Sequence, residues 1–238
     1  EFRVLGDLDG AFYLYQEAFK HGNSKNLRID AGLGMVDIYI AKGDLEAAEE
    51  KCAELIHQAP NVLEYQIKSA QILFYQGEFD QTESRLGEII EKIPMDDFTV
   101  NDILDVMAVL IGFRHNQEEF PEFAKIQLNI QQNKRTEALD KLETLFDTNE
   151  IYIADMCRYQ HAWLSFLQGD VEIAKLQLDE ILNETIWTEL AHIFQSEILD
   201  FTDKNISGAI DSYLEFLELY PQSIYYDDVR LRLREITS

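Results

Sequence analysis

Two stretches of the sequence decide its fold: GDLEAAEEKCAELI, from Gly43 to Ile56, and GEFDQTESRLGEII, from Gly77 to Ile90. They align at an offset of 34 residues, and Pro60 aligns with Pro94 at the same offset. Two independent markers therefore indicate an internal repeat, the pattern that is typical of solenoids and other repeat architectures.

The same segment occurs in four further copies, which begin at Gly6, Asn133, Gly169 and Lys204. In each copy the residue five positions after the start is small. The residues nine and twelve positions after the start are apolar or nearly so. We expect the small residue to permit close packing of two helices, and the larger ones to fill the space between helix pairs. The small residues are Ala11, Ala48, Thr82, Ala138, Ala174 and Ala209.

The start of each copy predicts a turn between two antiparallel helices. Glycine can adopt the left-handed conformation that ends a helix, and the following Asp7, Asp44 or Asp170 can cap the next helix. Pro60, Pro94 and Pro221 close their units, because proline cannot continue a helix. Few prolines and glycines occur otherwise, and no strand-like alternation of polar and apolar residues is present, so the chain is expected to be helical throughout.

A unit of 34 residues with glycine at the internal turn, a small residue five positions on and a closing proline resembles the tetratricopeptide repeat. The second helices carry the resemblance clearly, whereas the first helices match less well, for example at Met35-Val36 and Tyr39. The resemblance implies a bacterial tetratricopeptide-containing protein. Its expected fold is an all-α, right-handed α-solenoid of antiparallel helix pairs, with about 12–13 helices in one solenoid over residues 1–238.

The period breaks once, between the copies that start at Gly77 and Asn133. The excess over one repeat holds an odd helix at FTVNDILDVMAVLIG, residues 98–112. We expect an N-terminal arm over residues 1–96, the extra helix with a kink, hinge or altered superhelical turn over 97–117, a C-terminal arm over 118–221 and a capping helix over 222–238. The alternative is a divergent repeat that simply accommodates the odd helix. Because the first copy lacks a complete partner helix before it, the array is expected to continue upstream.

Composition excludes several functions. The chain carries 20 Lys and Arg against 45 Asp and Glu, a net charge of −25, which disfavours binding to nucleic acid or to an anionic membrane surface. No uninterrupted apolar run is long enough for a transmembrane helix, so direct membrane insertion is not expected. Both a bacterial cytoplasmic and a periplasmic or envelope location are compatible with the sequence.

Catalytic and metal chemistry find little support in the sequence. The two cysteines, Cys52 and Cys157, lie too far apart to bridge, and Cys157 with His161 lacks further ligands for a metal. No phosphate-binding loop, nucleophile elbow or nucleophile–histidine motif is present. We expect no enzyme, no cofactor and no metal; an enzymatic role would require chemistry outside this sequence.

The resemblance implies that first helices line a concave groove that takes a partner protein or peptide. At the corresponding positions the later units carry aromatic residues, the residue types that dominate interface energetics. The alternative is that half or more of these side chains pack between units. The predicted groove residues are Phe74, Phe123, Gln127, Tyr159, Trp163, Phe166, Phe194 and Phe201.

The sequence therefore predicts a non-catalytic scaffold or adaptor for protein–protein interaction that binds a peptide or helix in its groove. The alternative is a self-assembling module that forms homo-oligomers through the groove or its end helices. Three arginines near the C-terminus, Arg230, Arg232 and Arg234, are expected to meet an acidic surface of another copy or of upstream repeats.

Overall fold

The computed structural model describes residues 6–94, 99–182 and 184–237. The start of the expected N-terminal arm, the first residues of the expected odd helix and the last residue of the capping helix lie outside these ranges. The described residues form helices, turns and loops without a strand. The chain divides into two compact units, residues 1–138 and 139–238, which we describe separately.

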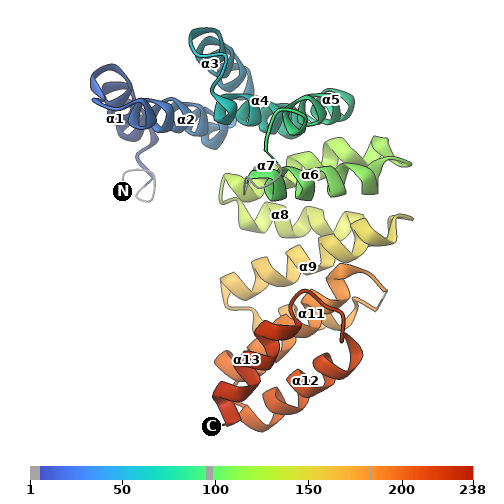
Figure 1. Cartoon of the computed structure of the whole chain (residues 1–238). Helices are drawn as coiled ribbons and strands as arrows, with labels where there is room; N and C mark the ends of the chain where they lie inside the picture. The colour runs from blue at the N-terminus through green and yellow to red at the C-terminus, as the bar shows by residue number, and fades with distance from the viewer. Residues whose placement is uncertain (1–5, 95–98, 183, 238) are drawn as a thin grey trace. The chain divides into compact units, whose positions relative to one another are not determined.

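Unit 1 is a series of α-helices in which each packs against the next as far as α6 (Figure 1). The helices are α1 (Leu8–His21), α2 (Lys25–Lys42), α3 (Leu45–Gln58), α4 (Leu63–Gln76), α5 (Phe79–Ile90), α6 (Thr99–Phe113) and α7 (Phe120–Gln131), and a 3₁₀ turn (Gln117–Glu119) precedes α7. Helix α8 (Arg135–Leu142) spans the boundary between the units.

Unit 2 continues with a second series of packed helices. A 3₁₀ turn (Glu143–Leu145) leads to α9 (Ile151–Gln168), α10 (Val171–Asp179) and α11 (Ile186–Glu197), and then to a π-helix (Ile198–Thr202), α12 (Ile206–Leu219) and α13 (Tyr226–Thr237). Neighbours in sequence pack in pairs from α9 to α13. These thirteen α-helices of the described residues confirm the all-α fold of packed helix pairs.

The backbone confirms the positions of the repeat starts. Positive φ angles occur in the described residues at exactly the six predicted starts, including the two that are not glycine, Asn133 at 60° and Lys204 at 57°. The left-handed conformation is therefore kept even where the side chain makes it unfavourable. The glycines are Gly6, Gly43, Gly77 and Gly169.

The repeated apolar positions form the core, as predicted. The small residue is buried in all six copies, and from the second copy onward both later positions are buried as well. In the first copy Tyr15 and Ala18 are only partly buried.

The predicted helix caps are present in part. Asp7 accepts a hydrogen bond from the N–H of Gly10, and Asp44 accepts one from the N–H of Ala47. Asp170 makes no side-chain cap bond, so its predicted role is wrong. Asn205 instead caps α12 by accepting from the N–H of Gly208.

The odd helix is present as α6, which packs against α5, whereas α7 packs against α4 and reaches α2. At one end of α7, Pro121 lies so close to Gly77 that a Cβ there would be 3.0 Å from the proline ring. At the other end, Gln132 Nε2 donates to the carbonyl of Ile40 at 3.0 Å. Helix α7 therefore crosses the C-terminal ends of α4 and α2, and covers the face on which a groove was predicted.

Helix α13 is fixed to unit 2 by Arg232, one of the three arginines expected to meet an acidic surface of another copy or of upstream repeats. Its guanidinium donates to both carboxylate oxygens of Asp200, at 2.8 and 3.1 Å, and lies over the ring of Phe201. Arg230 pairs with Asp227 on its own helix. The basic cluster thus serves internal contacts, because Asp200 is buried and requires a cation.

Candidate functional site: an exposed aromatic patch

Two predicted groove residues of unit 1, the half-buried Phe74 and the buried Phe123, lie in one aromatic cluster. The ring of Phe74 contacts those of Phe120 and Phe123 edge to face, at 5.2 and 6.2 Å between centroids. Phe123 is 1% exposed, and Phe113 and Phe120 are fully buried. Helix α7 brings Phe120 and Phe123 onto α4, so the apolar surface that Phe74 offers is used within the unit. Gln127 lies on the same helix, half-buried.

The predicted residues of unit 2 form an open cluster on α9 and α11. Tyr159, Trp163 and Phe166 share one face of α9, because they are four and then three residues apart. Phe194 of α11 contacts all three rings, at centroid distances of 6.0, 5.4 and 5.3 Å. The structure therefore brings these four predicted residues together.

Two further aromatic residues, which the sequence-based prediction missed, extend this cluster. Trp187 of α11 contacts Tyr159 at 5.5 Å and Tyr152 at 5.8 Å between centroids. A signal for both existed: Tyr152 is seven residues before Tyr159, and Trp187 is seven residues before Phe194, so each shares its partner's helix face. We call the six residues the aromatic patch: Tyr152, Tyr159, Trp163, Phe166, Trp187 and Phe194.

Exposure differs strongly across the aromatic patch. Phe194 is 4% exposed and belongs to the core of unit 2, whereas Trp163 is 46% exposed. The other four side chains are half-buried. Trp163 stacks on Phe166 at an interplanar angle of 24°, so its outer ring face is open to solvent while its inner side is held. Such a rigid, half-exposed aromatic platform is typical of a binding surface.

Phe201 lies apart from the aromatic patch. It is 50% exposed, and its contact is the guanidinium of Arg232, 4.5 Å from the ring centroid. The prediction that Phe201 and Trp163 belong to one groove therefore stays a prediction, although Phe201 and Phe194 are seven residues apart along the same chain segment.

Two polar groups of the aromatic patch, the hydroxyl of Tyr159 and the indole N–H of Trp187, are affected by burial. Burial raises the pKa of Tyr159 to about 12, and the negative charge of Glu197 contributes to that shift. The indole N–H of Trp187 is buried without a hydrogen-bond acceptor in the described part of the chain. Its ring is thus held by packing alone, which leaves a donor unsatisfied at a cost of about 1–3 kcal/mol.

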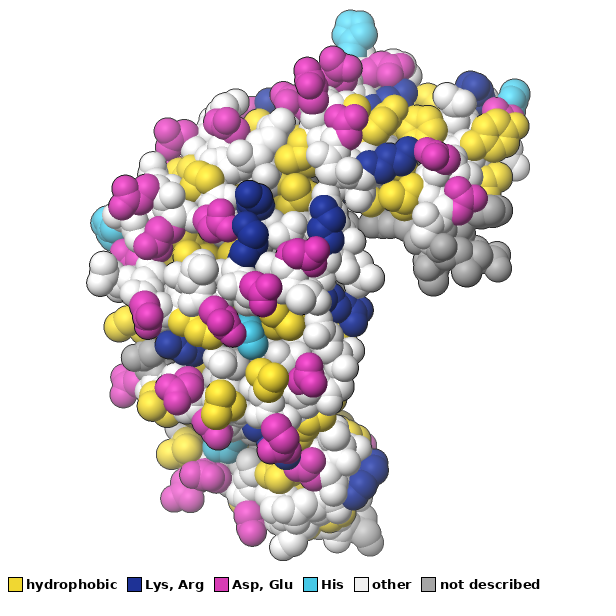
Figure 2. All heavy atoms as spheres, turned by 180° about the vertical axis from the view of Figure 1, so that it is seen from behind, with side chains coloured by type: hydrophobic (Ala, Val, Ile, Leu, Met, Phe, Trp, Pro, Cys, Tyr) yellow, Lys and Arg dark blue, Asp and Glu magenta, His cyan; other side chains and the backbone are white. Residues whose placement is uncertain are grey.

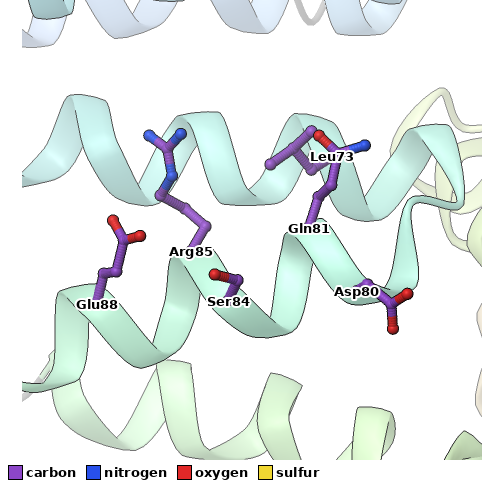
Figure 3. Close-up of a pocket in the computed structure, with 6 residues that line it drawn as sticks. All are labelled: Leu73, Asp80, Gln81, Ser84, Arg85 and Glu88. Atoms are coloured by element: carbon purple, nitrogen blue, oxygen red, sulfur yellow. The ribbon is translucent and has the colours of Figure 1, made fainter.

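Two surface pockets lie in the described part of unit 1. A pocket of about 280 Å³ lies between α4 and α5, where Arg85 and Gln81 extend from α5 toward α4 (Figure 3). Its lining contains one hydroxyl, that of Ser84, and no histidine or cysteine to activate it. A second pocket of unit 1, about 290 Å³, is lined by Phe19, Lys25, Arg28, Ile29, Leu55, Gln58, Ala59, Val62 and Tyr65.

Neither cysteine belongs to a reactive or metal-binding group. Both thiols are buried, and burial raises the pKa of Cys52 to about 11, which keeps it protonated. Among the described residues no three His, Cys, Asp or Glu side chains are grouped so that they could hold a metal ion. No described helix has the length and apolar character to cross a membrane.

These features define an α-helical repeat protein with a partly exposed aromatic patch. A family model described as the tetratricopeptide repeat matches residues 5–72, so this part of the chain is similar to tetratricopeptide repeats. Repeats of this family generally mediate protein–protein interaction, and the fold is typically a non-catalytic scaffold.

Comparison with curated proteins gives no match. Among solved structures, one titled "Functional Characterization of Pseudomonas Aeruginosa pilF" aligns with 94% of this chain and 97% of its own, at 15% identity and a TM-score of 0.33. A TM-score this low supports no argument about the present chain.

Proposed function

We propose that unit 2 binds a partner polypeptide through the aromatic patch. The observation that carries this proposal is Trp163, a tryptophan that is 46% exposed yet stacked on Phe166 and packed against the buried Phe194. A tryptophan in this position contributes a large apolar area at little entropic cost when a partner covers it.

The contrast with unit 1 supports this location. There Phe123 is 1% exposed and Phe74 is half-buried against α7, whereas in unit 2 Trp163 is 46% exposed. An extended or helical segment with apolar side chains fits a surface of this kind, because two neighbouring helices present rings at intervals of one and two turns.

The test is capture of partner proteins on the immobilised chain, compared with two variants. Trp163→Ala should abolish capture, because one such residue contributes roughly 2 kcal/mol or more to a typical interface. Ile173→Ala is the matched control, since Ile173 of α10 is also 46% exposed and lies outside the aromatic patch. If a protein retained by the unchanged chain is retained equally by Trp163→Ala, the proposal is wrong.

Self-assembly is a second candidate, favoured by apolar residues near the C-terminal end. Leu219, Ile224 and Leu231 are 57%, 81% and 57% exposed. A second copy that covers them would produce a homo-oligomer through the end helices. Light scattering at several protein concentrations distinguishes this from partner binding, because a homo-oligomer shows a molar mass that rises with concentration.

A further inference from the structure

Glu197 ends α11 beside the aromatic patch. It is three residues after Phe194 and four before Phe201, so it lies on the same side of this segment as both rings. The side chain is exposed, and its charge contributes to raising the pKa of Tyr159 of α9 and of Tyr213 of α12. A carboxylate therefore borders the exposed aromatic rings.

This carboxylate has no cationic partner within the described residues. The nearest charge that affects it is another carboxylate, Asp200, which together with partial desolvation raises the pKa of Glu197. Asp200 is itself neutralised by Arg232, whereas no Lys, Arg or His of the described chain forms an ion pair with Glu197. Unit 2 thus holds an uncompensated negative charge next to an apolar surface, an arrangement that disfavours folding and favours a cation.

Unit 2 has few cations, and those with ion pairs are bound to other carboxylates. Residues 139–238 contain seven Lys and Arg against twenty Asp and Glu. Lys175 pairs with Glu172 and Asp203, Arg230 with Asp227, and Arg232 with Asp200 and Glu235. One face of the molecule shows this excess directly, with acidic side chains spread over it and basic ones few (Figure 2).

The same segment already contains one example of a cation held by a carboxylate and an aromatic ring. Arg232 donates to Asp200 and lies 4.5 Å above the centroid of Phe201. Glu197 precedes Asp200 by about one helical turn and follows Phe194 of the aromatic patch by three residues, and no arginine forms an ion pair with it within the described residues. The Arg232 contact shows how a basic side chain would be bound, by an ion pair on one side and a ring face on the other.

We propose that the aromatic patch recognises a basic apolar segment of a partner polypeptide, in which a Lys or Arg pairs with Glu197 while neighbouring apolar side chains cover Trp163 and Phe166. This inference rests on the proposed function and adds the chemical class of the partner. An acidic segment is rejected, because twenty carboxylates repel it and none of its groups neutralises Glu197.

The test uses calorimetric titration of the full chain with three synthetic helical peptides, each roughly 14 residues long. All three carry leucine on one face; the other face carries lysine, glutamine or glutamate. The lysine peptide should bind about tenfold or more tightly than the glutamine peptide, and the glutamate peptide should bind most weakly.

Glu197→Gln isolates the proposed ion pair. It should lower the affinity for the lysine peptide about fivefold, because one accessible charge pair is lost, and leave the affinity for the glutamine peptide unchanged. Glu180→Gln is the matched control, since it removes one equal charge from the end of α10, and it should change the affinity less than about twofold. Equal losses in the two variants would show non-specific attraction and overturn the proposal.

Tryptophan fluorescence tests whether the peptide binds at the aromatic patch. The chain has two tryptophans, both in the aromatic patch, so Trp187→Phe leaves Trp163 as the reporter. Its emission should shift on binding of the lysine peptide. A shift with no dependence on Glu197 leaves partner binding at the patch intact and contradicts only its basic character; binding without any shift contradicts the proposed function as well.

Discussion

Units 1 and 2 differ in how the aromatic residues of their predicted groove are packed. In unit 1, the half-buried Phe74 packs against the buried Phe120 and Phe123 of α7. In unit 2, Trp163 stands on Phe166 and Phe194 with an open ring face. Phe74 corresponds in the repeat to Phe166, three residues before the turn glycine, whereas Trp163 corresponds to Gln71. The exposure of such aromatic residues therefore differs between the units, and the difference depends on whether a neighbouring helix packs across them.

The largest expected effect compares two aromatic truncations. Phe123→Ala should lower the free energy of unfolding by about 3–5 kcal/mol, because it empties a buried site in unit 1. Trp163→Ala should lower the free energy of unfolding by about 1 kcal/mol or less, since much of the Trp163 ring is in water in the folded as well as in the unfolded state. Urea unfolding followed by circular dichroism measures both, and comparable losses would contradict the contrast between a buried and an exposed aromatic residue.

The second prediction concerns how unit 2 holds its last helix. Arg232→Ala should destabilise unit 2 by about 3 kcal/mol, because it leaves the buried carboxylate of Asp200 without a cation. Arg230→Ala removes only an exposed pair within α13 and should cost less than about 0.5 kcal/mol. Hydrogen exchange of the α13 amides distinguishes the two variants, and equal protection in both would show that Asp200 does not anchor the helix.

A third comparison uses two glycines with positive φ angles. Gly77 of unit 1 has φ +79° with Pro121 against it, whereas Gly169 of unit 2 has φ +92° and open space. Gly169→Ala should cost about 1 kcal/mol for backbone strain, and Gly77→Ala about 1 kcal/mol more, since α7 must move. Thermal unfolding of the two variants measures the additional loss of stability at Gly77. Equal decreases in the unfolding temperature would mean that α7 moves away from residue 77 at little cost.

The smallest expected effect is a pH dependence of the stability of unit 2. His161 is 4% exposed, and burial lowers its pKa below the ordinary value of 6.5, although Glu143 acts in the opposite direction. Its neutral form is favoured in the folded state, so this contribution to stability is present above pH 6.5 and is lost as the pH falls below that value.

Unfolding at pH 7.5 and 5.5 checks this assignment against a variant. His161→Gln removes the titrating group, and its loss of stability between the two pH values should be smaller than that of the unchanged chain. An identical pH dependence in both would assign the effect to other groups.

The repeat and its core could be predicted from the sequence because the signals are local. A left-handed residue at each start, a small residue five positions on and a closing proline each act within one or two helices. Asn133 and Lys204 show the strength of that pattern, since they adopt positive φ without glycine.

The distinction between covered and open aromatic residues could not be predicted in this way. It depends on α7, whose position follows from the odd helix α6 and from contacts of Pro121 and Gln132 with residues up to 92 positions away. The binding of Arg232 by Asp200 is likewise a contact across 32 residues, which no periodicity specifies.

The π-helix at Ile198–Thr202 has a consequence for the length of the repeat. The copies that begin at Gly169 and Lys204 are 35 residues apart, one more than the standard unit. A π turn accommodates one additional residue, and here the N–H of Asp203 bonds to the carbonyl of Ile198 five residues before it. The additional residue is thus accommodated inside a helix instead of in a loop. It lies in the π turn that contains Asp200, which binds Arg232, and the exposed Phe201.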